Sequence, residues 1–130
     1  MINMNDVAAA FPAVSGLQPI ARGGQKLVFR GVHQNYGDVV VKLLLSTRTD
    51  PRIKREIAIA TSCQIPNTAQ LYESGSVTIC GNDVAYLIEE FIQGETLRQV
   101  LQREGKLSLV GTLALLESLL DTAIVMEQHD

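Results

Sequence analysis

A lysine in the middle of an apolar strand is the feature that most limits what this chain can fold into. The run from Val39 to Leu45 is apolar at every position except Lys42. A short continuous apolar run is typical of a strand buried on both faces. A buried ammonium is costly unless an anion meets it. The sequence therefore predicts a sheet in which a carboxylate or a bound anion lies beside Lys42.

The residues around this strand predict a hairpin. Its strands are expected at Ile20–Val32 and Asp38–Leu45, joined by a turn at Asn35–Asp38 in which Gly37 supplies the turn geometry. The first strand carries the pair Gly23-Gly24. Glycine weakens a strand interior, so this pair indicates a bulge or a close approach of the backbone to something else.

A helix is expected over Pro51–Ser62, after Asp50 as its cap. Its apolar residues recur at helical spacing, and Glu56 lies at the edge of that stripe. Glu56 could then face the sheet and serve as the anion for Lys42. It could equally pair with Arg52 in solvent, one helical turn away. The spacing alone leaves both interpretations open.

A second hairpin is expected over Ala69–Phe91, with its turn at Gly81–Asp83, and a short helix capped by Thr96 and ended by Gly105. A further short helix is possible within the first 17 residues. The last segment, Ser108–Asp130, is predicted to be a long helix with apolar residues around most of its circumference. Because two carboxylates lie in its middle, Glu117 and Asp121, we expect protein around it rather than a membrane.

Composition excludes several classes of function. Eleven basic and 14 acidic residues give a net charge of −3 with no basic stripe, so nucleic acid is not an expected partner. The N-terminus has no basic leader with an apolar core, so we expect a cytoplasmic protein without a membrane anchor. Cys63 and Cys80 stand apart and are interpreted as reduced thiols. His33 has no second ligand nearby and is interpreted as a solvated loop residue.

Taken together, these motifs resemble one protein family. The glycine-rich segment, Val-Val-Val-Lys, the helix with Arg-Glu-Ile and the strand ending Glu-Glu-Phe-Ile-Gln-Gly-Glu-Thr-Leu follow one another as in the N-terminal lobe of the bacterial Ser/Thr protein kinases. The resemblance extends from Leu17 to the end of the chain. It implies an α+β fold in which one helix packs on a five-stranded antiparallel sheet and two helices follow.

The resemblance also implies roles for individual residues. In that family a strand lysine holds the ATP phosphates and a helix glutamate pairs with it, which places Lys42 and Glu56 in these two catalytic roles. The glycine motif that covers the phosphates keeps only its central glycine here, Gly23. Lys26 at the tip of the loop could offer a cation instead.

The remaining implied contacts belong to the adenine. Val28 and Val40 match the residues that roof the ring, while the backbone of Glu90 and Ile92 would bond its edge. Glu89 lies where the family keeps the side chain at the back of the pocket, and an acid there is unusual. The complete candidate set for ATP is Ile20, Ala21, Gly23, Gly24, Lys26, Val28, Val40, Lys42, Glu90, Ile92 and Thr96.

The resemblance is to part of a kinase domain. Residues 18–93 would form the lobe with the ATP-binding sheet, and residues 94–130 the helices that follow it. The family's catalytic aspartate and both magnesium ligands lie in motifs that would come after Asp130. We therefore expect no metal ligand within the chain and no phosphate transfer by the chain alone.

Three functions remain open at this point. The chain could be the ATP-binding part of a protein kinase whose other lobe supplies the chemistry. It could be a small kinase-like regulatory protein that binds a nucleotide or a partner without catalysis. It could also be a fold of similar outline in which Lys42 and Glu56 form a structural pair and no nucleotide binds. The helix at 108–130 would bind either the missing lobe or a second copy of the chain.

Overall fold

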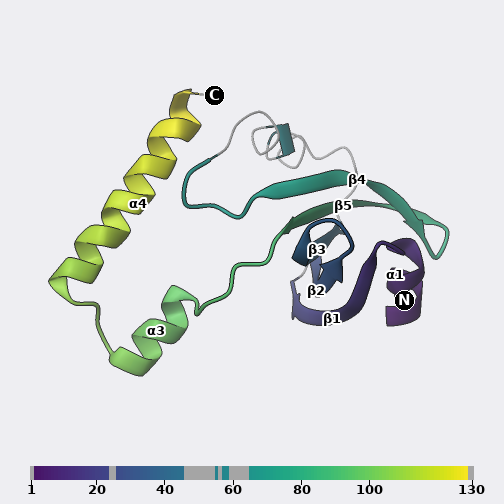
Figure 1. The fold of residues 1–130 in the computed structure, drawn as a ribbon, viewed down its shortest axis with the longest axis horizontal. Coiled ribbons are helices and arrows are strands. Elements are labelled where there is room, and N and C mark those ends of the chain that lie inside the picture. The colour runs from purple at the N-terminus through teal and green to yellow at the C-terminus, as the bar shows by residue number, and fades with distance from the viewer. Residues whose placement is uncertain (1, 24–25, 46–54, 56, 59–64, 129–130) are drawn as a thin grey trace. The chain divides into compact units, whose positions relative to one another are not determined.

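The computed structural model describes residues 2–23, 26–45, 55, 57–58 and 65–128. It has the predicted α+β fold, built on a five-stranded antiparallel sheet (Figure 1). The elements in chain order are α1 (Met4–Ala10), β1 (Val14–Arg22), β2 (Lys26–His33), β3 (Gly37–Leu44), β4 (Leu71–Ile79), β5 (Asn82–Glu90), α3 (Leu97–Glu104) and α4 (Leu109–Gln128). The strand order across the sheet is β1-β2-β3-β5-β4, which places the Lys42 strand in the centre.

The two faces of the sheet bury different side chains. Val39, Val41 and Leu43 of β3 point to one face and are fully buried, with no exposed surface. Because residues alternate along a strand, Val40 and Lys42 point to the opposite face. We call the first the α1 face, since its core includes Val7 of α1, and the second the Lys42 face.

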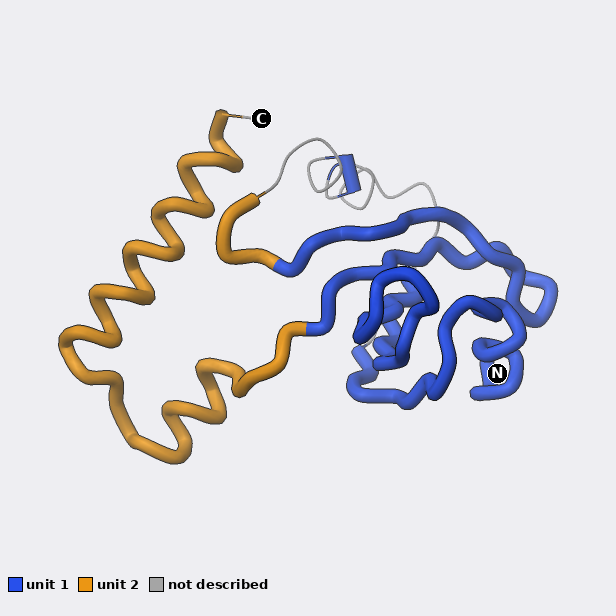
Figure 2. The backbone as a smooth tube through the Cα atoms, viewed as in Figure 1, with its two compact units in different colours: residues 1–62, 69–91 blue, residues 63–68, 92–130 orange. Residues whose placement is uncertain are grey.

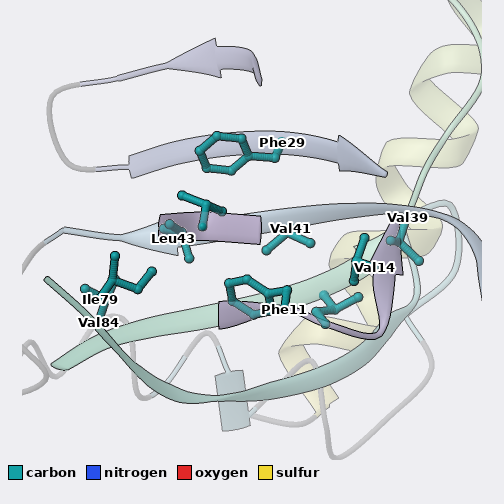
Figure 3. Packing of buried hydrophobic residues seen from close by; sticks show 10 residues of the cluster. Phe11, Val14, Phe29, Val39, Val41, Leu43, Ile79 and Val84 are labelled. Atoms are coloured by element: carbon teal, nitrogen blue, oxygen red, sulfur yellow. The ribbon is translucent and has the colours of Figure 1, made fainter. Parts of the chain in front are cut away.

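The core of the α1 face joins the N-terminal segment to the sheet. The ring of Phe11, which follows α1, meets the ring of Tyr86 edge-on at 5.0 Å between centroids. Figure 3 shows the side chains of this cluster as sticks, and its buried members are Val7, Phe11, Val14, Phe29, Val39, Val41, Leu43, Ile79, Val84 and Ile88. The N-terminal segment, in which the sequence indicated only a possible short helix, therefore closes one face of the sheet.

The expectation of one strand over Ile20–Val32 was wrong. The chain reverses within this range, so that β1 and β2 are antiparallel neighbours and Ala21 lies opposite Val28. The backbone N–H of Gly23 donates to the carbonyl of Lys26 at 2.9 Å across the turn. Gly23 therefore lies at a reversal between two strands rather than at a bulge within one strand.

The turn of the second hairpin begins one residue earlier than predicted and has two residues instead of three. Ile79 of β4 pairs with Asn82 of β5, which leaves Cys80 and Gly81 as the two turn residues. Both have positive φ, 51° and 76°, as a two-residue turn of the mirror-image type I requires. Asn82 and Asp83, which the sequence analysis assigned to the turn, are instead the first residues of β5.

The interpretation of His33 as a solvated residue was also wrong. His33 ends β2 with only 4% of its surface exposed. Its Nδ1 accepts the backbone N–H of Asn35 at 3.1 Å, and its ring stacks on Tyr36, which in turn stacks on Tyr72. The alternation of β2 accounts for this, because His33 shares the α1 face with buried Phe29.

A carboxylate links α1 to the second hairpin. Asp6 belongs to the capping box of α1, and its Oδ2 accepts the Sγ–H of Cys80 at 3.1 Å. This hydrogen bond raises the pKa of the Cys80 thiol, since the carboxylate favours the protonated form. It also lowers the pKa of the Asp6 carboxyl.

We therefore expect the Cys80 thiol to need a higher pH for alkylation than an ordinary thiol, because only the thiolate reacts. Asp6→Asn should shift the curve of alkylation rate against pH toward lower pH, and peptide mapping can separate Cys80 from Cys63. Asp83→Asn is a matched control, since Asp83 bonds Thr78 in the same hairpin at 2.8 Å. If the pH midpoint of Cys80 alkylation were the same in Asp6→Asn as in Asp83→Asn, the hydrogen bond to Asp6 would not be what raises the pKa of the thiol.

The chain divides into two compact units, coloured in Figure 2. The first comprises Met1–Ser62 and Ala69–Phe91 and contains the sheet; the second comprises Cys63–Thr68 and Ile92–Asp130. Of the predicted helix Pro51–Ser62, Arg55, Ile57 and Ala58 are described and are helical. The rest of it, including Glu56, lies outside the described residues, as does Cys63.

The second unit contains the two predicted helices. Thr96 caps α3 by accepting the N–H of Gln99, and Gly105 ends it with φ of 77°. Neither α3 nor α4 contains a buried residue, although burial of α4 was expected from its composition. By length and hydropathy alone, α4 could also cross a membrane. Its central Glu117 and Asp121 weigh against that.

Candidate functional site

The Lys42 face brings together side chains from three adjacent strands. In the antiparallel register Val28 of β2 lies opposite Lys42, and Leu87 of β5 lies opposite Lys42 on its other side. Val40 is flanked in the same way by Arg30 and Glu89. Directly opposed residues share a face. The candidate site thus consists of Val28, Arg30, Val40, Lys42, Leu87 and Glu89.

Lys42 has an anionic partner, as the sequence predicted for a lysine in this strand. Its Nζ donates a hydrogen bond to Oε2 of Glu89 at 2.5 Å. The lysine side chain is 29% exposed and the glutamate side chain 16%. Both charges are therefore partly shielded from water. The attraction between them is stronger in this setting than at a fully exposed surface.

The register of β3 and β5 explains why these two residues meet. Glu89 lies opposite Val40, two residues before Lys42 on the same face. Such diagonal neighbours are about 7–8 Å apart at the backbone, within reach of two long side chains. Sequence reasoning singled out Glu89 as an unusual acid but gave the pairing to Glu56, which lies outside the described residues. The pairing of Lys42 with Glu56 thus stays a prediction.

Arg30 is a second cation of this face that sequence reasoning missed. Its guanidinium lies 4.0 Å from the centroid of the Phe91 ring and 3.2 Å from a carboxylate oxygen of Asp38. The backbone N–H of Phe91 also donates to the carbonyl of Asp38 at 3.3 Å. Arg30 therefore contacts both Asp38 at the start of β3 and Phe91 just after the end of β5, and so stabilises this end of the sheet. The signal that could have found it is the alternation Lys26, Val28, Arg30 along one strand.

The other predicted nucleotide contacts of the first three strands lie beside Lys42 or around the turn between β1 and β2. Val28 and Val40 are half-buried diagonal neighbours on β2 and β3, since Val28 lies opposite Lys42 and Val40 lies opposite Arg30. Gly23 and Lys26 flank the turn, bonded backbone to backbone. Ile20 and Ala21 are exposed residues of β1. Gly24 lies outside the described residues.

The predicted contacts at the end of β5 have other partners. Glu90 lies opposite Val39, so its side chain belongs to the α1 face. Its carboxylate accepts the backbone N–H of Gln70 at 3.2 Å, and its own N–H donates to the carbonyl of Gln70 at 2.8 Å. Ile92 and Thr96 belong to the second unit, where Ile92 is exposed and Thr96 caps α3.

Among the residues that the structure describes, no three side chains of His, Cys, Asp or Glu gather where they could hold a metal ion. The Lys42 face thus carries two cations, Lys42 and Arg30, and the Glu89 carboxylate beside two half-buried valines, Val28 and Val40. Such a surface suits a flat apolar ring, and the ammonium suits an oxyanion.

Relatives of this chain are found among the protein kinases. It is 35% identical over 105 residues to the serine/threonine-protein kinase PknA of Mycobacterium tuberculosis, a match that covers 75% of this chain and 24% of the relative. It is 26% identical over 111 residues to the probable serine/threonine-protein kinase pknA2 of Bifidobacterium longum, covering 78% of this chain and 14% of the relative. It is 29% identical over 114 residues to the probable serine/threonine-protein kinase zyg-1 of Caenorhabditis briggsae, covering 88% of this chain and 15% of the relative.

No family model matches the chain. The chain spans about a quarter of the length of the PknA relative. Within that span, the predicted resemblance to the N-terminal lobe of the Ser/Thr protein kinases is confirmed, since the relatives carry that name and the five-stranded antiparallel sheet fits such a lobe.

Proposed function

We propose that this chain, a kinase N-lobe-like domain, is the ATP-binding lobe of a cytoplasmic Ser/Thr protein kinase-like protein. The whole protein would transfer the terminal phosphoryl group of ATP to a hydroxyl group of a protein substrate. The chain of 130 residues would bind the nucleotide on its Lys42 face and would not catalyse the transfer by itself. ATP supplies the phosphoryl group, and the residues of this chain supply binding and orientation.

The observation that carries this proposal is the position of Lys42. Its ammonium lies on the central strand, bonds an oxyanion at 2.5 Å, and has Val28 and Val40 beside it on the same face. A lysine in this setting can donate to a phosphate oxygen while the two valines cover the apolar surface of the base. An ammonium with 29% of its side chain exposed is also accessible to a ligand.

We expect the affinity for ATP to be weak. Good small-molecule sites enclose most of their ligand, whereas a single sheet face covers one side of it. The magnesium ligands of the kinase family lie in motifs beyond this lobe. The nucleotide itself and any protein residues beyond this lobe would then contribute the remaining contacts.

The proposal is tested by measuring ATP binding to the chain by calorimetry at high protein concentration. Lys42→Ala should weaken binding by at least about tenfold, because it removes the only ammonium placed centrally on this face in the described structure. Lys106→Ala is a matched control, since Lys106 lies in the exposed link between α3 and α4.

Equal loss of binding in the two variants would indicate a general effect of charge and would contradict the proposed site. Tight binding that depends on magnesium would contradict the expected weakness and would require metal ligands within this chain. Failure of every form to bind ATP, with the fold intact by circular dichroism, would favour a sheet in which Lys42 has only a structural role.

A further inference from the structure

The ammonium of Lys42 already forms an ion pair with a carboxylate of the protein itself, that of Glu89. The hydrogen bond from Nζ to Oε2 is 2.5 Å long, and the two side chains lie on one face of the sheet. A lysine ammonium has three donors and no acceptor. One donor is thus already committed to an anion that belongs to the protein.

The two residues are held in place by the sheet. Lys42 and Glu89 come from adjacent strands whose register runs from Val39 opposite Glu90 to Leu44 opposite Ala85. Each strand also pairs with another neighbour on its far side, β2 for Lys42 and β4 for Glu89. A backbone fixed on both sides leaves only side-chain rotation as a way to separate the two charges. The pair therefore does not depend on the placement of a helix.

The Glu89 side chain is less exposed than the Lys42 side chain. The Glu89 side chain is 16% exposed and that of Lys42 29%. Its neighbour on the same face, Leu87, is buried at 5% exposure. One donor of the ammonium is therefore directed toward the less exposed side chain, and its other two donors remain for a ligand. Any phosphate that reaches Lys42 also comes close to a negative charge, which repels it.

We infer that Glu89 is an internal counter-anion that competes with polyphosphate for Lys42 and so sets the anion affinity of this face. The inference rests on the proposed function, since it concerns the same site. Glu89 is not a catalytic residue in this role. It is a residue that determines affinity by holding Lys42, and its removal should strengthen binding rather than weaken it.

The experiment measures the Kd of ATP and of inorganic tripolyphosphate, at constant ionic strength, for the wild-type chain and for Glu89→Gln. The amide keeps the size of the side chain and removes its charge. We expect the Kd of both probes to fall by about tenfold. Tripolyphosphate lacks the base, so its response isolates the anion contact. Glu89→Met, which also removes the hydrogen-bond acceptor, should have the same direction of effect and guards against a folding defect in one variant.

The matched control is Glu73→Gln. Glu73 lies in the same sheet opposite Ile88, hence on the α1 face, and its carboxylate is 3.7 Å from Nε2 of His33. The charge change is identical, so an effect of net charge alone would appear equally in both variants. We expect the Kd of Glu73→Gln to stay within about twofold of the wild-type value.

The possible failures are distinguishable. If Lys42→Ala weakens ATP binding but Glu89→Gln does not strengthen it, this inference is overturned while the proposed function stands. If the gain in Glu89→Gln persists in the double variant with Lys42→Ala, the anion binds elsewhere and the inference is also overturned. If neither the wild-type chain nor Glu89→Gln binds ATP, the proposed function fails and the inference fails with it.

Discussion

Leu43→Ala is expected to lower the free energy of unfolding by about 3 kcal/mol, within the range of roughly 2–5 kcal/mol for such truncations in a core. Leu43 is fully buried on the α1 face at the centre of the sheet and pairs across to Leu27 and Tyr86. Neighbours that belong to three adjacent strands cannot all move inward, so a cavity should remain. Urea unfolding followed by circular dichroism measures the loss.

Leu45→Ala is the matched control for this variant. Leu45 lies two residues further along the chain, just beyond the end of β3, and is 42% exposed. The chemical change is the same, but little buried surface is lost, so we expect a change within about 1 kcal/mol. Similar losses in the two variants would mean that the α1 face is not the principal core of this sheet.

Self-association of the 130-residue chain through α4 is the second large effect that we expect. Within the described residues α4 buries no side chain, and Leu109, Leu113, Leu116, Leu119, Leu120 and Ile124 are each at least half exposed. An exposed apolar surface of roughly a few hundred Å² is near the limit for a soluble monomer, and burial returns about 25 cal/mol per Å². Pairing of two such helices across a two-fold axis would cover much of it.

Sedimentation equilibrium at tens of micromolar protein measures this directly, as an apparent mass of about twice that of the chain or more. Leu116→Lys or Leu120→Lys should restore the monomer, because each places a charge within the apolar surface. Gln102→Lys on α3 carries a charge of the same sign at a polar, exposed position and should leave the mass unchanged. A wild-type monomer at this concentration, or one unaffected by the leucine variants, would contradict the expectation.

The same apolar surface of α4 bears on the proposed whole protein. The PknA relative is about four times as long as the region matched here. We propose that α4 packs against the remaining lobe when that lobe is present, and that the contact between copies replaces it in the isolated chain. Addition of the longer protein's remaining region should then lower the mass of the self-associated form.

Local sequence patterns were enough to predict most of the elements. Gly37 has the positive φ expected of a turn residue, Thr96 caps α3, and Gly105 ends it. These features depend on the conformational preferences of single residues and their nearest neighbours. Apolar runs likewise located β3 and the second hairpin, and the apolar run around Lys42 predicted that the lysine would need an anion.

Some errors also had local causes. Gly23 and Gly24 are compatible both with an irregular strand and with a turn between two strands, so the sequence alone left the reversal undetected. His33 lies beside a turn, where polar residues are usually solvated. The stacked rings of Tyr36 and Tyr72 bury it, and Tyr72 comes from a strand that is 39 positions away in the chain.

By itself, then, the sequence determined the strand that carries Lys42 and the need of Lys42 for an anion, because periodicity, turn chemistry and the cost of a buried charge are local properties. The number of five strands followed from the family resemblance, and the central position of the lysine strand from the structure. Only the tertiary structure decided that Glu89 meets that lysine. The two residues are 47 positions apart, and they are neighbours because β5 returns to lie beside β3 in one register. A shift of that register by one residue would turn Glu89 to the other face, and no local pattern in the sequence fixes it.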